Sequence, residues 1–171
     1  MEMVKLIGGI LAILLGLPLL IVWLNDKVFR RLPSKAQRAE FSRRFTDRLL
    51  HPDFDTVEAH FDCSMPEAVK CLYKNKEEVV RENFEVQSQA ASDPNWYVAS
   101  YNPADAESLK DCWPDTRRFF AFASDGCGND YLVDPRDPES KVLFYDHETG
   151  EFSQVGMNLQ TFVSVSRRVS L

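Results

Sequence analysis

The sequence RRFFAFASDGCGNDYLVD, from Arg117 to Asp134, contains two apolar runs on either side of a short polar connection. The runs FFAFA and YLV are rich in aromatic and β-branched residues, which favour strands. The connection SDGCGND supplies glycine and aspartate residues, which tolerate the positive φ angles of a tight turn. No other stretch after the first 25 residues is so densely apolar. We therefore expect a β-hairpin at the centre of the core.

Shorter apolar runs around this hairpin predict the remaining elements. Helical spacing occupies residues 35–50 and 64–73, and Asn158 is placed to begin a last helix that reaches Val169. Further strands are predicted at residues 84–86, 96–101, 142–145 and 151–155. Helices followed by a run of strands and a final helix are typical of an α+β domain. We expect a largely antiparallel sheet of about five strands with helices packed around it.

The N-terminal stretch from Val4 to Leu24 is apolar except for Lys5. At ~1.5 Å per residue, 21 helical residues span the roughly 30 Å hydrocarbon core of a bilayer. The alternative is a cleaved signal peptide, but the run is long and no small-x-small cleavage site follows it. The sequence thus predicts one transmembrane helix before the domain, and three segments: an anchor at 1–25, a basic juxtamembrane helix at 26–50 and a globular domain at 51–171.

Charge is divided unevenly along the chain. Residues 1–48 hold nine Lys/Arg against four Asp/Glu, a net charge of +5, whereas residues 49–171 hold eleven against twenty-two, a net charge of −11. The basic residues that follow the apolar run predict a single-pass membrane protein whose globular domain lies in the cytoplasm. The acidic domain argues against direct nucleic-acid binding and is compatible with a basic protein partner. An acidic surface that serves only solubility is the alternative.

Catalytic and metal-binding patterns are weak. The three histidines have no metal-ligand spacing, and the four cysteines form no C-x-x-C pair. Asp125, Asp130 and Asp134 cluster around one hairpin and invite a cation site, but the spacing and the bidentate glutamate of a calcium loop are missing. Cys127 stands between two glycines without a histidine near it in sequence. We therefore expect no catalytic residue, no metal and no cofactor.

Several blocks of the sequence occur in an order that resembles the SUKH superfamily of SMI/KNR-type proteins. These blocks are LYKNKEEV, the Trp113-Pro114 pair, FFAFASDGCGNDYLVDP, KVLFYDHETGE and NLQTFV, and together they run from about Phe61 to Val165. The most specific block, F-A-x-D-G-x-G-x-x-Y-x-x-D, is matched by Phe122, Ala123, Asp125, Gly126, Gly128, Tyr131 and Asp134. The resemblance implies an α+β fold and a non-enzymatic, protein-binding role. The apolar N-terminal run departs from the usual pattern of the family.

The resemblance also implies a function. Many bacterial members look like immunity proteins that neutralise a toxin, often a nuclease, while similar fungal proteins act as regulatory interaction proteins. We expect a membrane-tethered protein that binds a toxin stoichiometrically, with a membrane-associated regulatory scaffold as the alternative and a hydrolase as a third. The predicted partner-binding residues are carboxylates of the two turns, which could equally serve only to form those turns: Asp125, Asp130, Asp134, Asp146 and Glu148.

Overall fold

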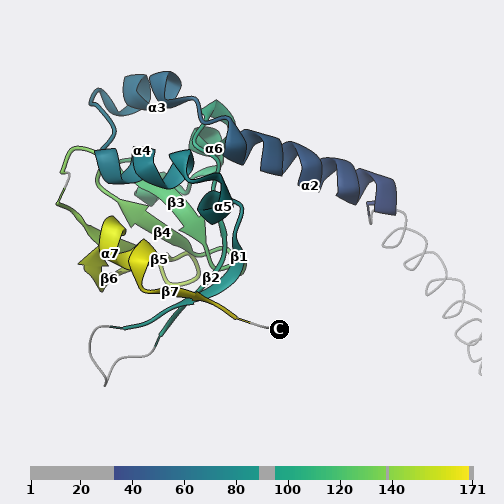
Figure 1. The fold of residues 1–171 in the computed structure, drawn as a ribbon. Coiled ribbons are helices and arrows are strands. Elements are labelled where there is room, and N and C mark those ends of the chain that lie inside the picture. Colours follow the sequence, from purple (N-terminus) through teal and green to yellow (C-terminus); the bar gives the residue numbers. More distant parts are fainter. Residues whose placement is uncertain (1–32, 89–94, 138, 170–171) are drawn as a thin grey trace, which may run out of the picture. The chain divides into compact units, whose positions relative to one another are not determined.

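The computed structural model describes residues 33–88, 95–137 and 139–169 (Figure 1). The chain separates into two compact units, Met1–Arg43 and Arg44–Leu171. The first contributes the beginning of helix α2 (Lys35–Leu50) to the described residues. The second contains the sheet and all other helices that the structure describes.

One antiparallel sheet of seven strands organises the second unit (Figure 1). Its strand order is β6-β5-β4-β3-β2-β1-β7, so the first six strands follow one another across the sheet as a meander and β7 adds to the free edge of β1. The strands are β1 (Glu82–Val86), β2 (Trp96–Tyr101), β3 (Phe120–Ser124), β4 (Asp130–Val133), β5 (Lys141–Asp146), β6 (Glu151–Asn158) and β7 (Ser166–Arg168).

The predicted central hairpin is present as β3 and β4. Phe120 pairs with Val133 and Ser124 pairs with Asp130 across it. In the turn, Gly126 has a φ of +79°. A Cβ atom at this position would lie 2.9 Å from the Cβ of Ala99, so both the backbone angle and the available space require glycine.

Short helices connect and cover the strands. They are α3 (Phe54–Phe61), α4 (Glu67–Lys74), α5 (Lys76–Val79), α6 (Ala106–Asp111), the 3-10 helix η1 (Pro114–Thr116) and α7 (Leu159–Ser164). The predicted cap Asn158 begins α7 by accepting a hydrogen bond from the Thr161 backbone N–H. Such caps matter in helices this short because most of their backbone donors have no partner within the helix.

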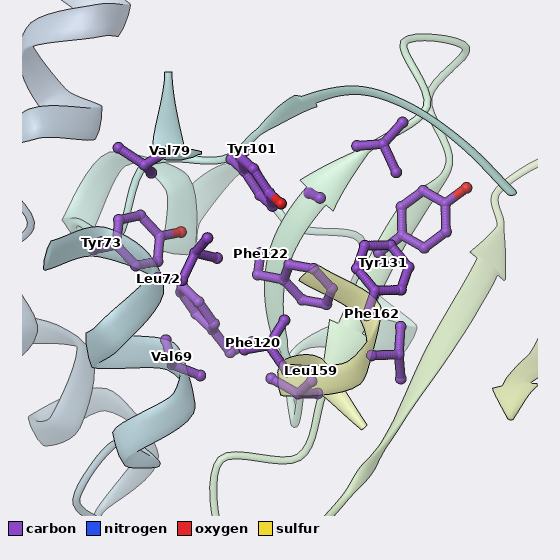
Figure 2. Close-up of a cluster of buried hydrophobic side chains, with 14 of the residues drawn as sticks. Val69, Leu72, Tyr73, Val79, Tyr101, Phe120, Phe122, Tyr131, Leu159 and Phe162 are labelled. Atoms are coloured by element: carbon purple, nitrogen blue, oxygen red, sulfur yellow. The ribbon is translucent and has the colours of Figure 1, made fainter. Parts of the chain in front are cut away.

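Side chains alternate between the two faces of the sheet and so form two apolar clusters. On β4, Tyr131 and Val133 belong to the main core, whereas Leu132 belongs to a smaller cluster with Phe119 and Tyr145. The main core lies between the sheet and helices α4 and α7. Figure 2 shows Val69, Leu72 and Tyr73 of α4 and Leu159 and Phe162 of α7 around Phe120, Phe122 and Tyr131 of the sheet.

Two predictions about the sheet and the last helix are wrong. The sheet has seven strands rather than about five, and the last helix ends at Ser164 instead of reaching Val169. The residues after it form β7, which pairs with β1 between Val86 and Ser166 and between Phe84 and Arg168. The reason is that β1 has an open edge, whose unpaired backbone groups form hydrogen bonds with another strand. Pairing with this edge satisfies the backbone of residues 166–168 better than the end of a helix would.

The prediction of a membrane-spanning helix and of a single-pass membrane location is also corrected. In residues 33–88, 95–137 and 139–169, no helix has both the length and the apolar character needed to cross a membrane. The longest described helix, α2, has 16 residues and carries charges along its length, so at ~1.5 Å per residue it is shorter than a bilayer core. The predicted anchor at residues 4–24 lies outside the described residues.

Candidate partner-binding surface

The turn between β3 and β4 is held by the Asp125 carboxylate. One oxygen, Oδ1, accepts hydrogen bonds from the backbone N–H of Cys127 at 2.8 Å and of Asn129 at 3.1 Å. The other, Oδ2, accepts a hydrogen bond from the Asn129 side-chain amide at 2.7 Å. Both oxygens are therefore occupied in forming the turn. This geometry favours a structural role for Asp125 over direct contact with a partner.

Asn129 joins this turn to the one between β5 and β6. Its Oδ1 accepts a hydrogen bond from the His147 backbone N–H at 3.0 Å and lies 2.9 Å from Nδ1 of the same histidine. A Cβ atom on Gly128 would lie 2.9 Å from the His147 ring, so the two turns approach as closely as glycine allows. The two turns thus form one end of the sheet.

Trp113 packs over this junction from the segment before η1. Its ring stacks on the His147 ring with centroids 5.2 Å apart and planes 21° apart, and its Nε1–H donates to the Gly128 carbonyl at 3.1 Å. The indole is 39% exposed, so it forms part of the surface as well as bracing it. The sequence gives no sign of this stack, because Trp113 lies 34 positions before His147 in the chain and no local pattern connects the two.

Asp130 is half-buried at the start of β4. Burial raises the pKa of its carboxyl group to about 6, since removing the charged form from water is unfavourable. A hydrogen bond from the Asn102 side chain acts in the opposite direction, and the negative charge of Asp125 raises the pKa further. Asp130 is thus a carboxyl group that changes charge close to neutral pH.

The second turn carries Asp146 and Glu148. Asp146 Oδ1 accepts hydrogen bonds from the backbone N–H of Glu148 at 2.9 Å and of Thr149 at 3.2 Å, which is again a turn-forming arrangement. Glu148 is exposed, and its carboxylate makes no hydrogen bond or ion pair with another described residue. Of the five predicted contact residues, Glu148 is the one whose carboxylate is most available to a partner.

Asp134 lies apart from the other four. It follows β4, at the end of that strand opposite Asp130, and four residues of strand separate the two by roughly 13 Å. Its Oδ1 accepts hydrogen bonds from the backbone N–H and from Nε of Arg136, both at 3.0 Å. We call the remaining set the acidic turn surface, which consists of Asp125, Asp130, Asp146 and Glu148.

The described residues contain no cluster of three or more His, Cys, Asp or Glu side chains arranged to hold a metal ion. All four cysteines are free thiols, and Cys127 is exposed at the tip of the first turn. Burial raises the pKa of the Cys63 and Cys112 thiols, which makes them less reactive as nucleophiles. The arrangement at the turns is that of a braced polar surface.

The second unit is thus an antiparallel α+β domain with a braced acidic surface at one end of its sheet. A comparison with protein families identifies its family. The model of the SMI1 / KNR4 family (SUKH-1) matches residues 52–164, which is more than half of the chain, and the chain belongs to this family. Domains of this family are generally non-catalytic and bind partner proteins. Comparison with curated proteins and with solved structures gives no match.

Proposed function

We propose that this protein is an immunity protein that neutralises a toxin, such as a basic nuclease, by binding it in a stoichiometric complex. The observation that carries the proposal is the acidic turn surface on a domain of net charge −11, in a chain of the SUKH-1 family. A nuclease active site is basic because it binds phosphates. A rigid acidic surface is complementary to such a groove and needs little reordering when it binds.

The mechanism would be occlusion of the toxin's substrate groove. Complementary charge accelerates the encounter of the two proteins and selects against other acidic proteins. Glu148 would make the most direct contact, with Asp130 and Trp113 beside it. Asp125 and Asp146 would act mainly by fixing the two turns, and Asp134 would contact the toxin only if the interface extended to the other end of β4.

The test is co-expression with the toxin domains encoded beside the gene for this chain, scored by cell survival, followed by calorimetry on the purified pair. We expect rescue and a one-to-one complex. Glu148→Lys should reduce the association rate about tenfold at low salt, because complementary charge accelerates the encounter of the two proteins. Asp55→Lys, which reverses an exposed carboxylate on α3, is the matched control and should leave the association rate unchanged.

The outcomes are distinct. Survival without a detectable complex would contradict stoichiometric binding. Absence of both rescue and binding, together with capture of a non-toxic partner, would favour the alternative of a regulatory interaction protein. Equal loss of binding in Glu148→Lys and Asp55→Lys would remove the assignment of the contact to the turn surface.

A further inference from the structure

A groove runs along helices α4 and α7, which lie side by side on the helical face of the sheet (Figures 1 and 2). Three hollows form it, with volumes of about 230, 340 and 530 Å³. Residues of α4 and α7 line the first two, and the third lies beyond the end of α4, against α5, β1 and β7. The first and second share Glu67, Ala68, Leu159 and Gln160, and the second and third share Asn75 and Glu78. The three hollows therefore adjoin one another.

The floor of the groove is apolar. Ala68 and Leu72 of α4 line the middle hollow from one side, and Leu159 and Val163 of α7 line it from the other. Both helices are short, with eight and six residues, so neither fills the space beyond its ends. Leu72 and Leu159 are each only 4% exposed, so a bound segment would cover mainly the half-buried Ala68 and Val163, with a gain of about 25 cal/mol per Å² of apolar surface.

The walls of the groove are acidic. Six carboxylate residues line it and only two basic ones, Arg81 and Arg168, do so. The carboxylates lie at both ends of the groove and are Glu67, Asp137 and Glu139 at one end and Glu77, Glu78 and Glu82 at the other.

Part of this charge is already balanced. Glu67 pairs with Lys74 at 2.9 Å, and Glu78 pairs with Arg81 at 3.2 Å. Arg81 in addition donates a hydrogen bond to the Ser166 hydroxyl.

Three carboxylates remain available. Glu77, Glu82 and Glu139 are exposed, and their side chains make no hydrogen bond or ion pair with other described residues. They stand at both ends of the groove, and Arg168 also lines the end that holds Glu77 and Glu82.

We propose that the α4–α7 groove binds an extended segment of the partner protein in which basic residues flank apolar ones. The apolar side chains would cover the floor between Ala68 and Val163, and the basic side chains would reach Glu139 at one end and Glu77 and Glu82 at the other. Helix α4 is about 12 Å long at ~1.5 Å per residue, which an extended segment matches with about four residues at ~3.3 Å each. This inference rests on the proposed protein-binding function and adds a second contact site, on a different part of the surface from the acidic turns.

The test needs no toxin. A fluorescein-labelled synthetic peptide of twelve residues, in which lysine and arginine alternate with leucine and valine, is titrated with the full chain and followed by fluorescence anisotropy. A peptide with glutamate in place of each basic residue is the charge control. We expect the basic peptide to bind at least tenfold more tightly than the acidic one. Gln160→Trp, which fills the groove from α7, and the double variant Glu77→Lys, Glu139→Lys should each weaken binding of the basic peptide at least tenfold.

Two matched variants locate the binding. Gln154→Trp adds the same bulk on exposed β6, and Asp55→Lys reverses an exposed carboxylate on α3 that lines none of the three hollows; neither should change the affinity more than twofold. Equal affinity of all four variants for the basic peptide, or no binding by the unaltered chain, would overturn the proposal. A peptide with the chain's own residues 26–38, DKVFRRLPSKAQR, is included. Tenfold tighter binding of that peptide would assign the groove to the chain itself and would also overturn it.

The two proposals fail separately. If the groove binds the basic peptide but no toxin is neutralised, the proposed function fails and the groove assignment stands. If a toxin is neutralised equally by the unaltered chain and by Gln160→Trp, and the basic peptide does not bind, the groove assignment fails and the function stands.

Discussion

Replacement of Asp130 by asparagine is expected to change how the stability of the protein depends on pH. Burial at the start of β4 raises the pKa of this carboxyl group from 3.8 to about 6. Asparagine has almost the same shape and no charge, so Asp130→Asn removes the titration and keeps an oxygen that can accept the hydrogen bond of Asn102. The difference between the two proteins therefore isolates the cost of ionising this one group.

The sign follows from the direction of the shift. Below about pH 4 the carboxyl group is protonated in both the folded and the unfolded state, and its burial carries no charge penalty. Between about pH 4 and pH 6 the unfolded state ionises first, so the free energy of unfolding falls as the pH rises. Above about pH 6 the loss is complete. A shift of about two units at 1.36 kcal/mol per unit corresponds to about 3 kcal/mol, as an order of magnitude.

The measurement is urea unfolding followed by tryptophan fluorescence at pH 4, 5, 6, 7 and 8. The free energy of unfolding of Asp130→Asn, minus that of the unaltered protein, should rise by about 3 kcal/mol from pH 4 to pH 7 and then remain constant. Glu148→Gln removes one exposed carboxylate from the neighbouring turn and controls for the change in net charge. A difference that stays flat from pH 4 to pH 7 would show that Asp130 carries no ionisation penalty and would refute the reasoning.

Two further predictions concern the turns and the attachment of α2. Gly150→Ala should cost about 1–2 kcal/mol of stability, because a left-handed φ of +72° is unfavourable for alanine although no atom lies within 4 Å of the added Cβ. Gly126→Ala has a similar φ and also places its Cβ 2.9 Å from that of Ala99, so it should cost at least 1 kcal/mol more than Gly150→Ala. Thermal unfolding of the two variants measures this difference. An equal loss of stability in both would contradict the steric argument. Arg48→Met should destabilise the protein by about 3–5 kcal/mol at pH 7 as an upper estimate, because Nε and Nη2 of Arg48 bind the partly buried Asp105 carboxylate at 2.6 and 2.8 Å. The hydrogen bond from Arg48 lowers the pKa of Asp105, so this stabilisation is present above pH 4 and is lost as the pH falls further. The free energy of unfolding of Arg48→Met should therefore approach that of the unaltered protein below pH 4. A difference between the two that does not shrink in urea unfolding below pH 4 would contradict this prediction.

Much of the sheet was predictable because its strands have a local signal. The alternation of Tyr131, Leu132 and Val133 between two clusters is visible in the sequence as a short run of apolar residues that is buried on both faces. Strand β7 has no such signal. Its sequence, Ser166-Arg167-Arg168, is polar, and it becomes a strand only because β1 offers a free edge eighty residues earlier in the chain. The strand propensity of a segment does not predict a pairing that depends on the partner strand.

The candidate surface was predictable only in its composition. Acidic residues in the two turns were recognisable from the sequence, but their meeting depends on Asn129 binding His147 and on Trp113 stacking on the His147 ring. The same limit applies to Asp134, which is close to Asp130 in sequence and lies at the opposite end of the strand in space. The groove between α4 and α7 had no signal at all, because its two walls come from helices that are almost ninety residues apart.

The motif that identifies the family is used mainly to build the fold. Both carboxylate oxygens of Asp125 accept hydrogen bonds within its own turn. Position 126 requires glycine because of its positive φ and the close approach of Ala99. The Asp134 carboxylate accepts a hydrogen bond from Arg136. Groups that are already satisfied within the chain add little to the binding of a partner, because their hydrogen bonds would have to be exchanged rather than gained. The carboxylates that are exposed and unpaired, such as Glu148 at the turns and Glu77 and Glu139 at the groove, lie outside that motif. Selectivity for a partner should therefore depend on positions that the family motif does not include, and two chains that share the motif can bind different proteins.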